Sequence, residues 1–300
     1  MIIIGGGPAG LTAGLYTSRA GLKSLLLERG ILGGQVVNAR QVENYPGFPN
    51  GISGVELGSL MHQQATKYGL ETITADATGI TAGKPYNVST SDGSFEAESI
   101  IIAAGSEYSK LGIAGEERFS GHGVSYCATC DGFFFRDQEV AVVGGGDTAI
   151  TDALELSQYA GKVYIIHRRA QLRAGQVLQQ QAFANPKLEF IWDTVIDEII
   201  GEQVVTRLRL RNMKTGELSS LKVAGVFIAV GLKPNSQYFS NIVELDSAGS
   251  IITDELMATS TPGIFAAGDI RRNSARQVTS AVGDGATAAM SVSKYLRERS

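Results

Sequence analysis

Two cysteines that lie close together are the clearest chemical signal of the chain. The sequence contains only two, Cys127 and Cys130, and Asp131 follows directly after the second. Two sulfurs at positions i and i+3 can close a small disulfide ring and open it again, which is redox chemistry. The alternatives are two buried cysteines used as small apolar residues, or half of a zinc site. Zinc would need two further ligands, from carboxylates or from His62, His122 and His167. A redox-active pair without a metal is the favoured interpretation.

A glycine-rich turn lies on each side of the cysteine pair, and the two turns follow one design. Each comes after an apolar, β-branched run and before an amphipathic stretch, which is the context of a dinucleotide-binding fingerprint. Glycine lets backbone N–H groups approach a pyrophosphate, and the following helix points its positive end at the same anion. One such turn could be an ordinary turn, but two predict two dinucleotide sites. The first turn contains Gly5, Gly7, Pro8, Ala9 and Gly10, and the second contains Gly144, Gly146, Asp147, Thr148 and Ala149.

The two copies, aligned without gaps at a spacing of 139 residues, differ at the end of the second strand. In the first copy that strand ends in Glu28, an acid placed to hydrogen-bond a ribose 2′-hydroxyl. In the second copy His167, Arg168 and Arg169 stand there, followed by Arg173. Guanidinium groups can bind a 2′-phosphate that an acid would repel. The difference predicts FAD at the first site and NADPH at the second, with a solvated basic turn as the alternative for the arginines.

The remaining segments place these turns in two similar halves. Continuous apolar runs at 99–105 and 225–231 predict central strands of a parallel sheet, and alternating stretches at 71–95 and 208–223 predict small meanders. We expect helices at 54–68 and 280–297 and a further strand at 263–269. The last strand and helix have no third fingerprint, so we expect them to return to the first domain.

The sequence therefore predicts an α/β fold with two Rossmann-like (three-layer ββα) nucleotide-binding domains. The NADPH domain is expected to be inserted into the FAD domain. The predicted bounds are 1–108 and 236–300 for the FAD domain and 109–235 for the NADPH domain with its redox pair.

Composition and charge agree with this interpretation. A length of 300 residues suits two domains, and 43% apolar residues suffice for their cores. The net charge of −4 gives no reason to expect nucleic acid or an anionic membrane as a partner. No apolar run approaches the roughly 20 residues needed to cross a bilayer, and the N-terminus does not resemble a signal peptide. A reactive thiol pair with no other cysteine fits a reducing compartment, so we expect a cytoplasmic protein.

These motifs, in this order, resemble those of the low-molecular-weight (prokaryotic-type) thioredoxin reductases, which are class II pyridine nucleotide-disulfide oxidoreductases. The resemblance covers nearly the full chain. It rests on the segments 5–10, 42–48, 124–134, 144–149, 167–173 and 263–269, and on Arg276 and Gln277. It implies a flavoprotein enzyme, an NADPH-dependent thioredoxin-disulfide reductase, and a homodimer.

The resemblance also assigns residues to the two cofactors. The FAD diphosphate is expected at the first turn and its ribose at Glu28, with NADPH against the second turn and the basic motif. The flavin-side positions are Gly34, Gln35, Asn44, Asp269, Arg276 and Gln277. The glycines that end the two central strands, Gly105 and Gly231, complete the expected cofactor-binding set.

The implied mechanism is a relay from NADPH through FAD to the cysteine pair and then to a disulfide of thioredoxin. By the family pattern Cys130 lies close to the flavin and Cys127 attacks the partner. Asp131 is expected to act as the general acid, with an ordinary turn residue as the alternative. Because the cysteines and the nicotinamide must each reach the flavin, we expect the inserted domain to rotate about crossings near Tyr108 and Ser236.

One departure from the family pattern, one expectation about packing and three alternative functions complete the sequence predictions. The family commonly has an acid and an aromatic residue where this chain has Ala170-Gln171-Leu172, so we expect an altered nucleotide affinity. We expect at least two of the three aromatic residues 133–135 to be buried in the core. The alternatives are a nicotinamide-independent flavin dithiol oxidase, a reductase of another thioredoxin-like carrier, and a flavin-binding redox sensor without turnover.

Overall fold

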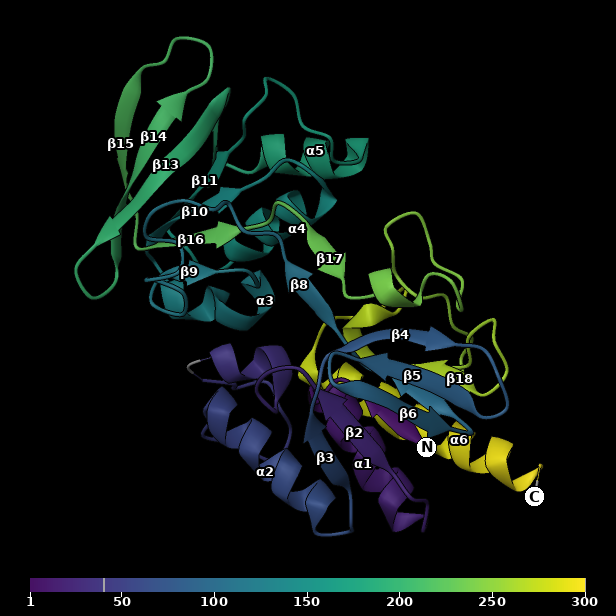
Figure 1. Ribbon diagram of the computed structural model, residues 1–300. Coiled ribbons are helices and arrows are strands. Elements are labelled where there is room, and N and C mark those ends of the chain that lie inside the picture. The colour runs from purple at the N-terminus through teal and green to yellow at the C-terminus, as the bar shows by residue number, and fades with distance from the viewer. Residues whose placement is uncertain (40, 300) are drawn as a thin grey trace. The chain divides into compact units, whose positions relative to one another are not determined.

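The chain folds as two compact units, each built around its own parallel sheet. A computed structural model describes residues 1–39 and 41–299 (Figure 1). The first unit consists of Met1–Glu107 and Lys233–Ser300, and the second consists of Tyr108–Leu232. The second unit is therefore inserted into the sequence of the first.

The first unit has a five-stranded sheet in the order β18-β7-β1-β2-β3. All neighbours are parallel, with Ile3 of β1 opposite Leu26 of β2 and Ile101 of β7. The strand β18 comes from the C-terminal part of the chain, so the tail completes this sheet. The strands are β1 Ile2–Ile4, β2 Leu25–Glu28, β3 Glu71–Thr74, β7 Ile100–Ile102 and β18 Ile264–Ala266.

Alternation along the strands gives the first unit three layers. Ile2 and Ile4 point into a core shared with Ile80 and Val88 of a three-stranded antiparallel sheet, whereas Ile3 points into a core lined by helices. This arrangement explains why short all-isoleucine strands are buried on both faces. The helices are α1 Pro8–Arg19, α2 Gly54–Thr66 and α6 Val278–Arg297, and the antiparallel strands are β4 Ala77–Thr81, β5 Tyr86–Thr90 and β6 Gly93–Ala97.

The second unit repeats these layers. Its parallel sheet has the order β12-β11-β10-β16-β9 and carries the antiparallel sheet β13-β14-β15 on one face. Val142 of β10 joins the helix-side core with Ile150, and Ala141 joins the other core with Leu208. The parallel strands are β9 Val124–Ser125, β10 Glu139–Val143, β11 Lys162–Ile166, β12 Leu188–Ile191 and β16 Gly225–Ile228. The other elements are α3 Ala128–Asp131, α4 Asp147–Leu156, α5 Gln176–Ala184, β13 Thr194–Gly201, β14 Val205–Asn212 and β15 Leu218–Lys222.

Short elements complete the chain. The segments by which the chain leaves and re-enters the first unit, β8 Ser106–Tyr108 and β17 Leu232–Pro234, pair as a two-stranded sheet. The 3-10 helices are η1 Gly34–Asn38, η2 Gly132–Phe135, η3 Gln237–Phe239 and η4 Gly268–Ile270. Among the residues that the structure describes, no helix is long and apolar enough to cross a membrane.

The predicted fold class is confirmed, and one strand lies elsewhere than expected. The stretch from Glu71 was predicted to begin the first meander, but β3 pairs in parallel with β2, with Thr72 opposite Leu26. Its alternating pattern has a different cause, because β3 is the edge strand of the parallel sheet and is mostly exposed. The meander itself consists of β4, β5 and β6.

Helix α6 offers a matched pair of glycines that tests its packing against α1. A Cβ at Gly285 would lie 2.2 Å from the carbonyl oxygen of Ala9, whereas a Cβ at Gly283 would meet nothing within 4 Å. Gly285→Ala should therefore destabilise the protein by about 1–3 kcal/mol through overpacking. Gly283→Ala should stabilise it by roughly 0.5–1 kcal/mol through helix propensity.

Denaturant unfolding followed by far-UV circular dichroism measures both changes. Equal effects of the two variants would contradict the close approach of α1 and α6.

Candidate active site

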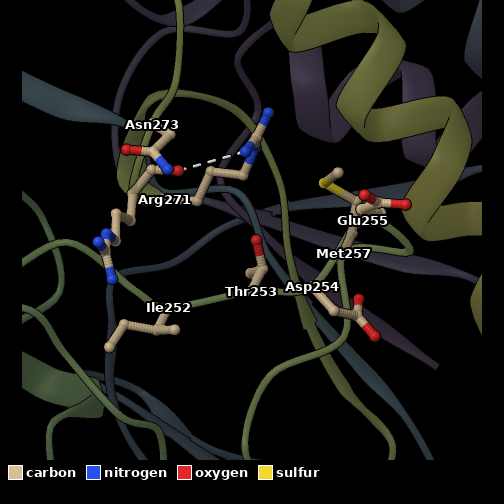
Figure 2. Close-up of a pocket in the computed structure, with 8 residues that line it drawn as sticks. Ile252, Thr253, Asp254, Glu255, Met257, Arg271 and Asn273 are labelled. Carbon is tan, nitrogen blue, oxygen red and sulfur yellow. Dashed lines mark hydrogen bonds between the residues drawn. The ribbon is translucent and has the colours of Figure 1, made fainter.

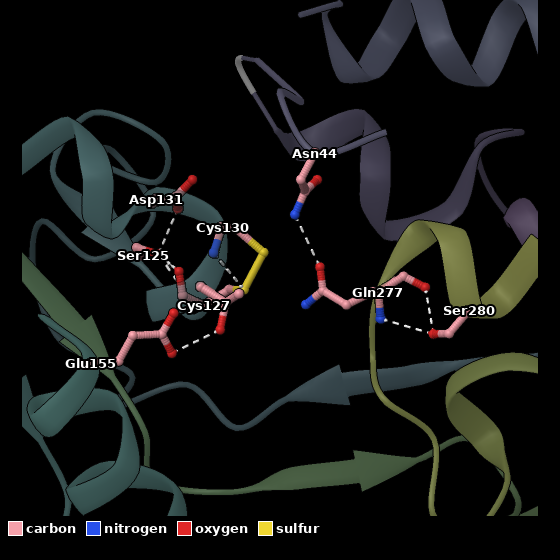
Figure 3. The surroundings of a disulfide bond; sticks show 9 residues. Asn44, Ser125, Cys127, Cys130, Asp131, Glu155, Gln277 and Ser280 are labelled. Carbon is pink, nitrogen blue, oxygen red and sulfur yellow. Dashed lines mark hydrogen bonds between the residues drawn. A yellow bond between two sulfur atoms is a disulfide. The ribbon is translucent and has the colours of Figure 1, made fainter. Parts of the chain in front are cut away.

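The two cysteines form a disulfide at the start of a short helix. Cys127 precedes α3 and Cys130 lies within it, with their Cα atoms 5.3 Å apart (Figure 3). The N–H of Cys130 points at Cys127 Sγ, at 3.2 Å. Cys130 is exposed and Cys127 is half-buried. The pair that the sequence singled out is thus a disulfide in which Cys130 is the more exposed residue.

Asp131 is held beside this disulfide by Ser125. The hydroxyl of Ser125 donates to Asp131 Oδ2 at 2.6 Å and accepts the N–H of Cys127 at 3.1 Å (Figure 3). Burial raises the pKa of the Asp131 carboxyl above its ordinary value, and the hydrogen bond from Ser125 opposes part of that rise. A carboxyl with a raised pKa keeps its proton to a higher pH than an ordinary aspartate does, and next to a disulfide it can deliver that proton to a thiolate.

A buried glutamate fixes the chain that leads to the disulfide. Glu116 is only 3% exposed, and its carboxylate accepts the N–H groups of Leu111 and Gly112 and the hydroxyl of Tyr126. The Tyr126 ring stacks on Tyr108 at a centroid distance of 5.2 Å. Burial and the bond to Glu116 raise the pKa of Tyr126, so it remains a neutral donor. Sequence reasoning missed Ser125, Glu116 and Tyr126, because nothing in their types or spacing marks them.

The first glycine turn has the shape that a pyrophosphate needs. Gly5 has a φ of 105°, and a Cβ at Gly10 would lie 1.8 Å from the carbonyl oxygen of Gly5, so both positions require glycine. A Cβ at Gly7 would meet only one atom, the Cα of Gly34 at 3.9 Å, so the chain leaves space there. The predicted Pro8, Ala9 and Gly10 form the first turn of α1. The turn therefore fits a dinucleotide phosphate at a helix N-terminus.

Glu28 already holds the backbone of this turn. Its Oε2 accepts the N–H of Gly6 at 2.6 Å, and its Oε1 accepts the N–H of Gly30 at 2.7 Å. An ionised carboxylate has about four acceptor positions, so room for ribose hydroxyls remains. Glu28 thus supports the turn as well as being available to a ribose.

Predicted flavin-side residues from distant parts of the chain come together in the first unit. Asn44 Nδ2 donates to Gln277 Oε1 at 3.1 Å, although 233 positions separate the two residues. Two further predicted residues, Asp269 and Arg276, are linked through Ser274. The hydroxyl of Ser274 donates to Asp269 Oδ1 and accepts the N–H of Arg276. Burial raises the pKa of Asp269, although the bond from Ser274 counteracts part of the effect.

The remaining predicted positions of this unit lie on nearby loops. Gly34 has a φ of 60° and approaches the first turn, because a Cβ there would be 2.9 Å from the Cα of Gly7. Gln35 accepts a hydrogen bond from Asn38. Gly105 has a φ of 64° with open space around it, and its carbonyl accepts the N–H of Asn235.

The second glycine turn repeats the first one. Gly144 has a φ of 150°, and a Cβ at Gly146 would meet nothing within 4 Å. Asp147 begins α4 and accepts the N–H of Gly175 at 2.7 Å, with Thr148 exposed and Ala149 buried behind it. Gly231, with a φ of 144°, approaches the hydroxyl of Ser109 in the same unit. This turn therefore also leaves room for a pyrophosphate.

The basic motif divides into exposed arginines and a buried histidine. Arg168, Arg169 and Arg173 are exposed, and none of them forms an ion pair within the part of the chain described. His167 is 5% exposed, and the space beside Gly145 is filled by its ring, which also meets Trp192 edge-on at 6.4 Å. Burial lowers the pKa of His167, and its Nε2 faces the carbonyl of Gln171 at 3.0 Å. The arginines can receive a phosphate, whereas His167 shapes the turn beneath them.

The three aromatic residues after the redox pair contradict the sequence prediction. Phe133 and Phe134 are 55% and 45% exposed, and only Phe135 packs inward, edge-on against Phe227. At least two of the three were predicted to be buried, which is wrong. Because these residues form the single turn η2 rather than a strand, successive rings point in different directions.

A pocket elsewhere in the first unit contains none of the predicted residues. Figure 2 shows this pocket of about 410 Å³, lined by Asp254, Met257, Arg271 and their neighbours. The Arg271 guanidinium pairs with Asp284 of α6, at 2.5 Å and 2.8 Å, and Asp284 also accepts the N–H of Gly268. The arginine therefore anchors α6 to the loop that carries Asp269. No group of His, Cys, Asp or Glu that could hold a metal occurs among residues 1–39 and 41–299.

Comparison with known proteins agrees with the paired nucleotide folds and the disulfide. Residues 1–285 match the family model described as pyridine nucleotide-disulphide oxidoreductase. The chain belongs to this family. It is 49% identical to a thioredoxin reductase of Listeria monocytogenes, over 99% of this chain and 94% of that protein. It is 48% identical to one of Bacillus subtilis, over 99% of this chain and 95% of that protein. The crystal structure of a thioredoxin reductase from Streptococcus pyogenes matches with a TM-score of 0.96 and 48% identity, covering 99% of this chain and 97% of that chain.

The raised pKa of Asp131 predicts how stability depends on pH. The native protein keeps the Asp131 proton to a higher pH than the unfolded chain does. The free energy of unfolding therefore falls as pH rises from the ordinary aspartate pKa, about 3.9, through the raised native value. Asp131→Asn abolishes this loss, so the variant should be at least as thermostable as the wild type at about pH 8, with the gain vanishing at about pH 4.

Thermal unfolding of both proteins across this range makes the measurement. Asp92→Asn, in an exposed turn, is the matched control. A lower Tm of Asp131→Asn at every pH would contradict the prediction.

Proposed function

We propose that the chain is an NADPH-dependent thioredoxin reductase, a flavoprotein that reduces the disulfide of thioredoxin. The observation that carries this proposal is the disulfide Cys127–Cys130 beside the half-buried carboxyl of Asp131. This centre lies in a chain that matches proteins named thioredoxin reductase over nearly their full length. The two glycine turns of the separate units supply the two dinucleotide sites that such a relay requires.

The first unit is the proposed FAD domain. The open turn at Gly7, the ribose acceptor Glu28 and the joined pair Asn44 and Gln277 support this assignment. The second unit is the proposed NADPH domain, with its phosphates at the turn from Gly144 to Ala149 and the 2′-phosphate at the exposed arginines 168, 169 and 173. The proposed domain bounds are 1–108 and 236–300 for FAD and 109–235 for NADPH, which differ by one to three residues from the bounds of the two units.

When bound, NADPH and FAD supply the two electrons, as hydride passed from nicotinamide to flavin, that open the Cys127–Cys130 disulfide. The chain's own residues then carry out the exchange. The Cys127 thiolate attacks the partner disulfide, Cys130 resolves the mixed disulfide, and Asp131 protonates the departing thiolate. A rotation of the inserted unit about the paired crossings β8 and β17 would let both reactants reach the flavin in turn.

The partner is proposed to bind over the redox loop. The exposed rings of Phe133 and Phe134 lie three and four residues after Cys130 in sequence and give an apolar contact for a small carrier protein. A homodimer, as the family resemblance implies, and a place in the cytoplasm, which the reactive thiol pair with no other cysteine favours, complete the proposal. Among residues 1–39 and 41–299, no observation favours the dithiol oxidase, the other carrier or the sensor.

Rapid mixing with reduced nicotinamides tests the electron donor. NADPH should bleach the flavin absorbance much faster than NADH does under anaerobic conditions. Replacing Arg168, Arg169 or Arg173 by Gln should raise the KM for NADPH by about ten-fold or more, because a charge-assisted phosphate contact is lost, and should leave the NADH rate unchanged. Arg207→Gln, an exposed arginine on β14, is the control.

A second signal is independent of the flavin. The only tryptophan, Trp192, lies next to His167, so its fluorescence should change when NADP⁺ binds to the second unit. Equal bleaching by NADPH and NADH, or none by either, would overturn the NADPH assignment.

Cysteine variants test the direction of the exchange. Cys127→Ser should keep flavin reduction by NADPH but lose thioredoxin reduction completely, because the attacking sulfur is absent. Cys130→Ser should accumulate a mixed disulfide between Cys127 and the partner, visible by mass spectrometry under non-reducing conditions. The control Thr129→Val, in the same loop, should still reduce thioredoxin.

A trapped complex through Cys130 in the Cys127→Ser variant, or oxygen consumption in place of thioredoxin reduction, would contradict the assignment.

A further inference from the structure

Ser125 is the residue through which the redox loop and the carboxyl of Asp131 are joined. It is 5% exposed, and its backbone is fixed because β9 pairs with β16, with Ser125 opposite Phe227. Its hydroxyl contacts Asp131 Oδ2 at 2.6 Å, the N–H of Cys127 at 3.1 Å and the carbonyl of Cys127 at 3.3 Å. A buried side chain on a fixed strand thus holds groups of a loop that must change during catalysis.

The hydroxyl of Ser125 has one proton for two acceptors. The bond to Asp131 Oδ2 is the shorter, so the hydroxyl proton lies towards Asp131 and the contact with the Cys127 carbonyl is secondary. The lone pairs of the same oxygen accept the N–H of Cys127. Ser125 therefore connects the attacking cysteine to the carboxyl by two short bonds.

Only one oxygen of Asp131 is occupied in this way. Within the part of the chain that the structure describes, Oδ1 accepts no hydrogen bond from a protein donor. With Oδ2 held by Ser125, Oδ1 is the oxygen that can carry a transferable proton. A carboxyl that rotated freely would present either oxygen and would be less well placed for the transfer.

We propose that Ser125 is a positioning residue, which orients Asp131 so that Oδ1 delivers its proton to the departing thiolate. This inference deepens the proposed function and rests on its disulfide exchange. Its test uses neither NADPH nor thioredoxin, so the inference about Ser125 and the proposed function can fail separately.

The proton balance of the exchange shows where the orientation acts. The Cys127 thiolate attacks one partner sulfur, the partner S–S bond breaks, and the leaving thiolate takes the proton of Asp131. The Cys130 thiol then passes its proton to the Asp131 carboxylate and attacks Cys127, which breaks the mixed disulfide. The second leaving thiolate takes that proton, so two electrons and two protons reach the partner and the enzyme is left as a disulfide.

Few other titratable or charged groups lie near Asp131 and the redox loop. Cys130 directly precedes Asp131, Cys127 shares the hydroxyl of Ser125 with it, and Glu155 of the neighbouring α4 accepts the Thr129 hydroxyl at 2.9 Å. Tyr126 donates to Glu116, and Arg136, after η2, lies over the Phe133 ring. The Ser125 bond favours the ionised form of Asp131, so its loss should raise the Asp131 pKa further.

Leaving-group dependence separates proton delivery from a merely structural role. An alkyl disulfide releases a basic thiolate that needs a proton, whereas an activated aromatic disulfide releases a weakly basic thiolate that does not. The full-length protein is reduced with dithiothreitol, desalted, and mixed anaerobically with hydroxyethyl disulfide or with 5,5′-dithiobis(2-nitrobenzoate). Ser125→Ala should react about ten-fold more slowly with the alkyl disulfide and within about two-fold of the wild type with the aromatic one.

Further variants complete the design. Ser125→Thr keeps the hydroxyl and should restore the alkyl rate, and Thr129→Val, which loses another hydroxyl–carboxylate bond of the loop, should leave it unchanged. Ser125→Ala should lower the alkyl rate no further in an Asp131→Asn background, because both changes remove the same proton transfer. The rate of the Ser125→Ala variant with the alkyl disulfide should depend on pH with a profile shifted to higher pH, because the Asp131 pKa rises when the Ser125 bond is lost.

Equal losses with both disulfides, or additive losses in the double variant, would overturn the inference and leave Ser125 a structural residue of the loop. If Ser125→Thr fails to fold, Ser125→Gly, which also lacks the hydroxyl, should reproduce the Ser125→Ala result. A normal alkyl rate in Ser125→Gly would likewise overturn it.

Discussion

The close approach of a glycine to the end of a neighbouring strand is the constraint on which both units depend. A Cβ at Gly5 would lie 2.4 Å from the carbonyl oxygen of Ala103, and a Cβ at Gly144 would lie 2.4 Å from that of Ala229. In each unit the turn that follows β1 or β10 thus lies against the chain that leaves the adjacent strand, β7 or β16. Only backbone fits there, which leaves the N–H groups at the start of the helix exposed for an anion.

The two units share this constraint but fill the space beside it differently. The middle glycine of each turn lies beside a residue at the end of the second strand. This residue is Glu28, the last of β2, at Gly6, and His167, directly after β11, at Gly145. In the first unit that residue is an anion that holds the N–H of Gly6. In the second it is an aromatic ring that packs under the glycine. The same position therefore supports the turn in both units, while the charge offered to a ligand differs.

The sequence predicted what depends on backbone geometry and covalent chemistry. The glycine turns follow from steric rules that act locally and the redox pair from the spacing of its cysteines, so the fold class and the redox pair could be inferred. His167 remains a predicted cofactor-binding residue, and the structure places its side chain, 5% exposed, beside Gly145 of the turn. The spacing of residues in the sequence does not tell which residue of the polar segment after a strand turns its side chain towards the interior.

Ser125 and Glu116 could not be predicted because their roles come from tertiary contacts. A serine on a two-residue strand and a glutamate in a loop are common, and only the fold brings their oxygens to Asp131, Cys127 and Tyr126. The rings of Phe133 and Phe134 were misplaced for a related reason, since composition favours burial but a single 3-10 turn cannot bury successive side chains.

The return of the chain to the first unit has a consequence for synthesis on the ribosome. The first unit lacks an outer strand of its sheet until Ile264–Ala266 is made, and lacks the helix that packs on α1 until Val278–Arg297 follows. The inserted unit is complete much earlier, at Leu232. Domains generally fold as units when their residues have emerged. The inserted unit can therefore fold while the first unit is still waiting for its last strand and helix, so the order of folding is opposite to the order in which the two units begin.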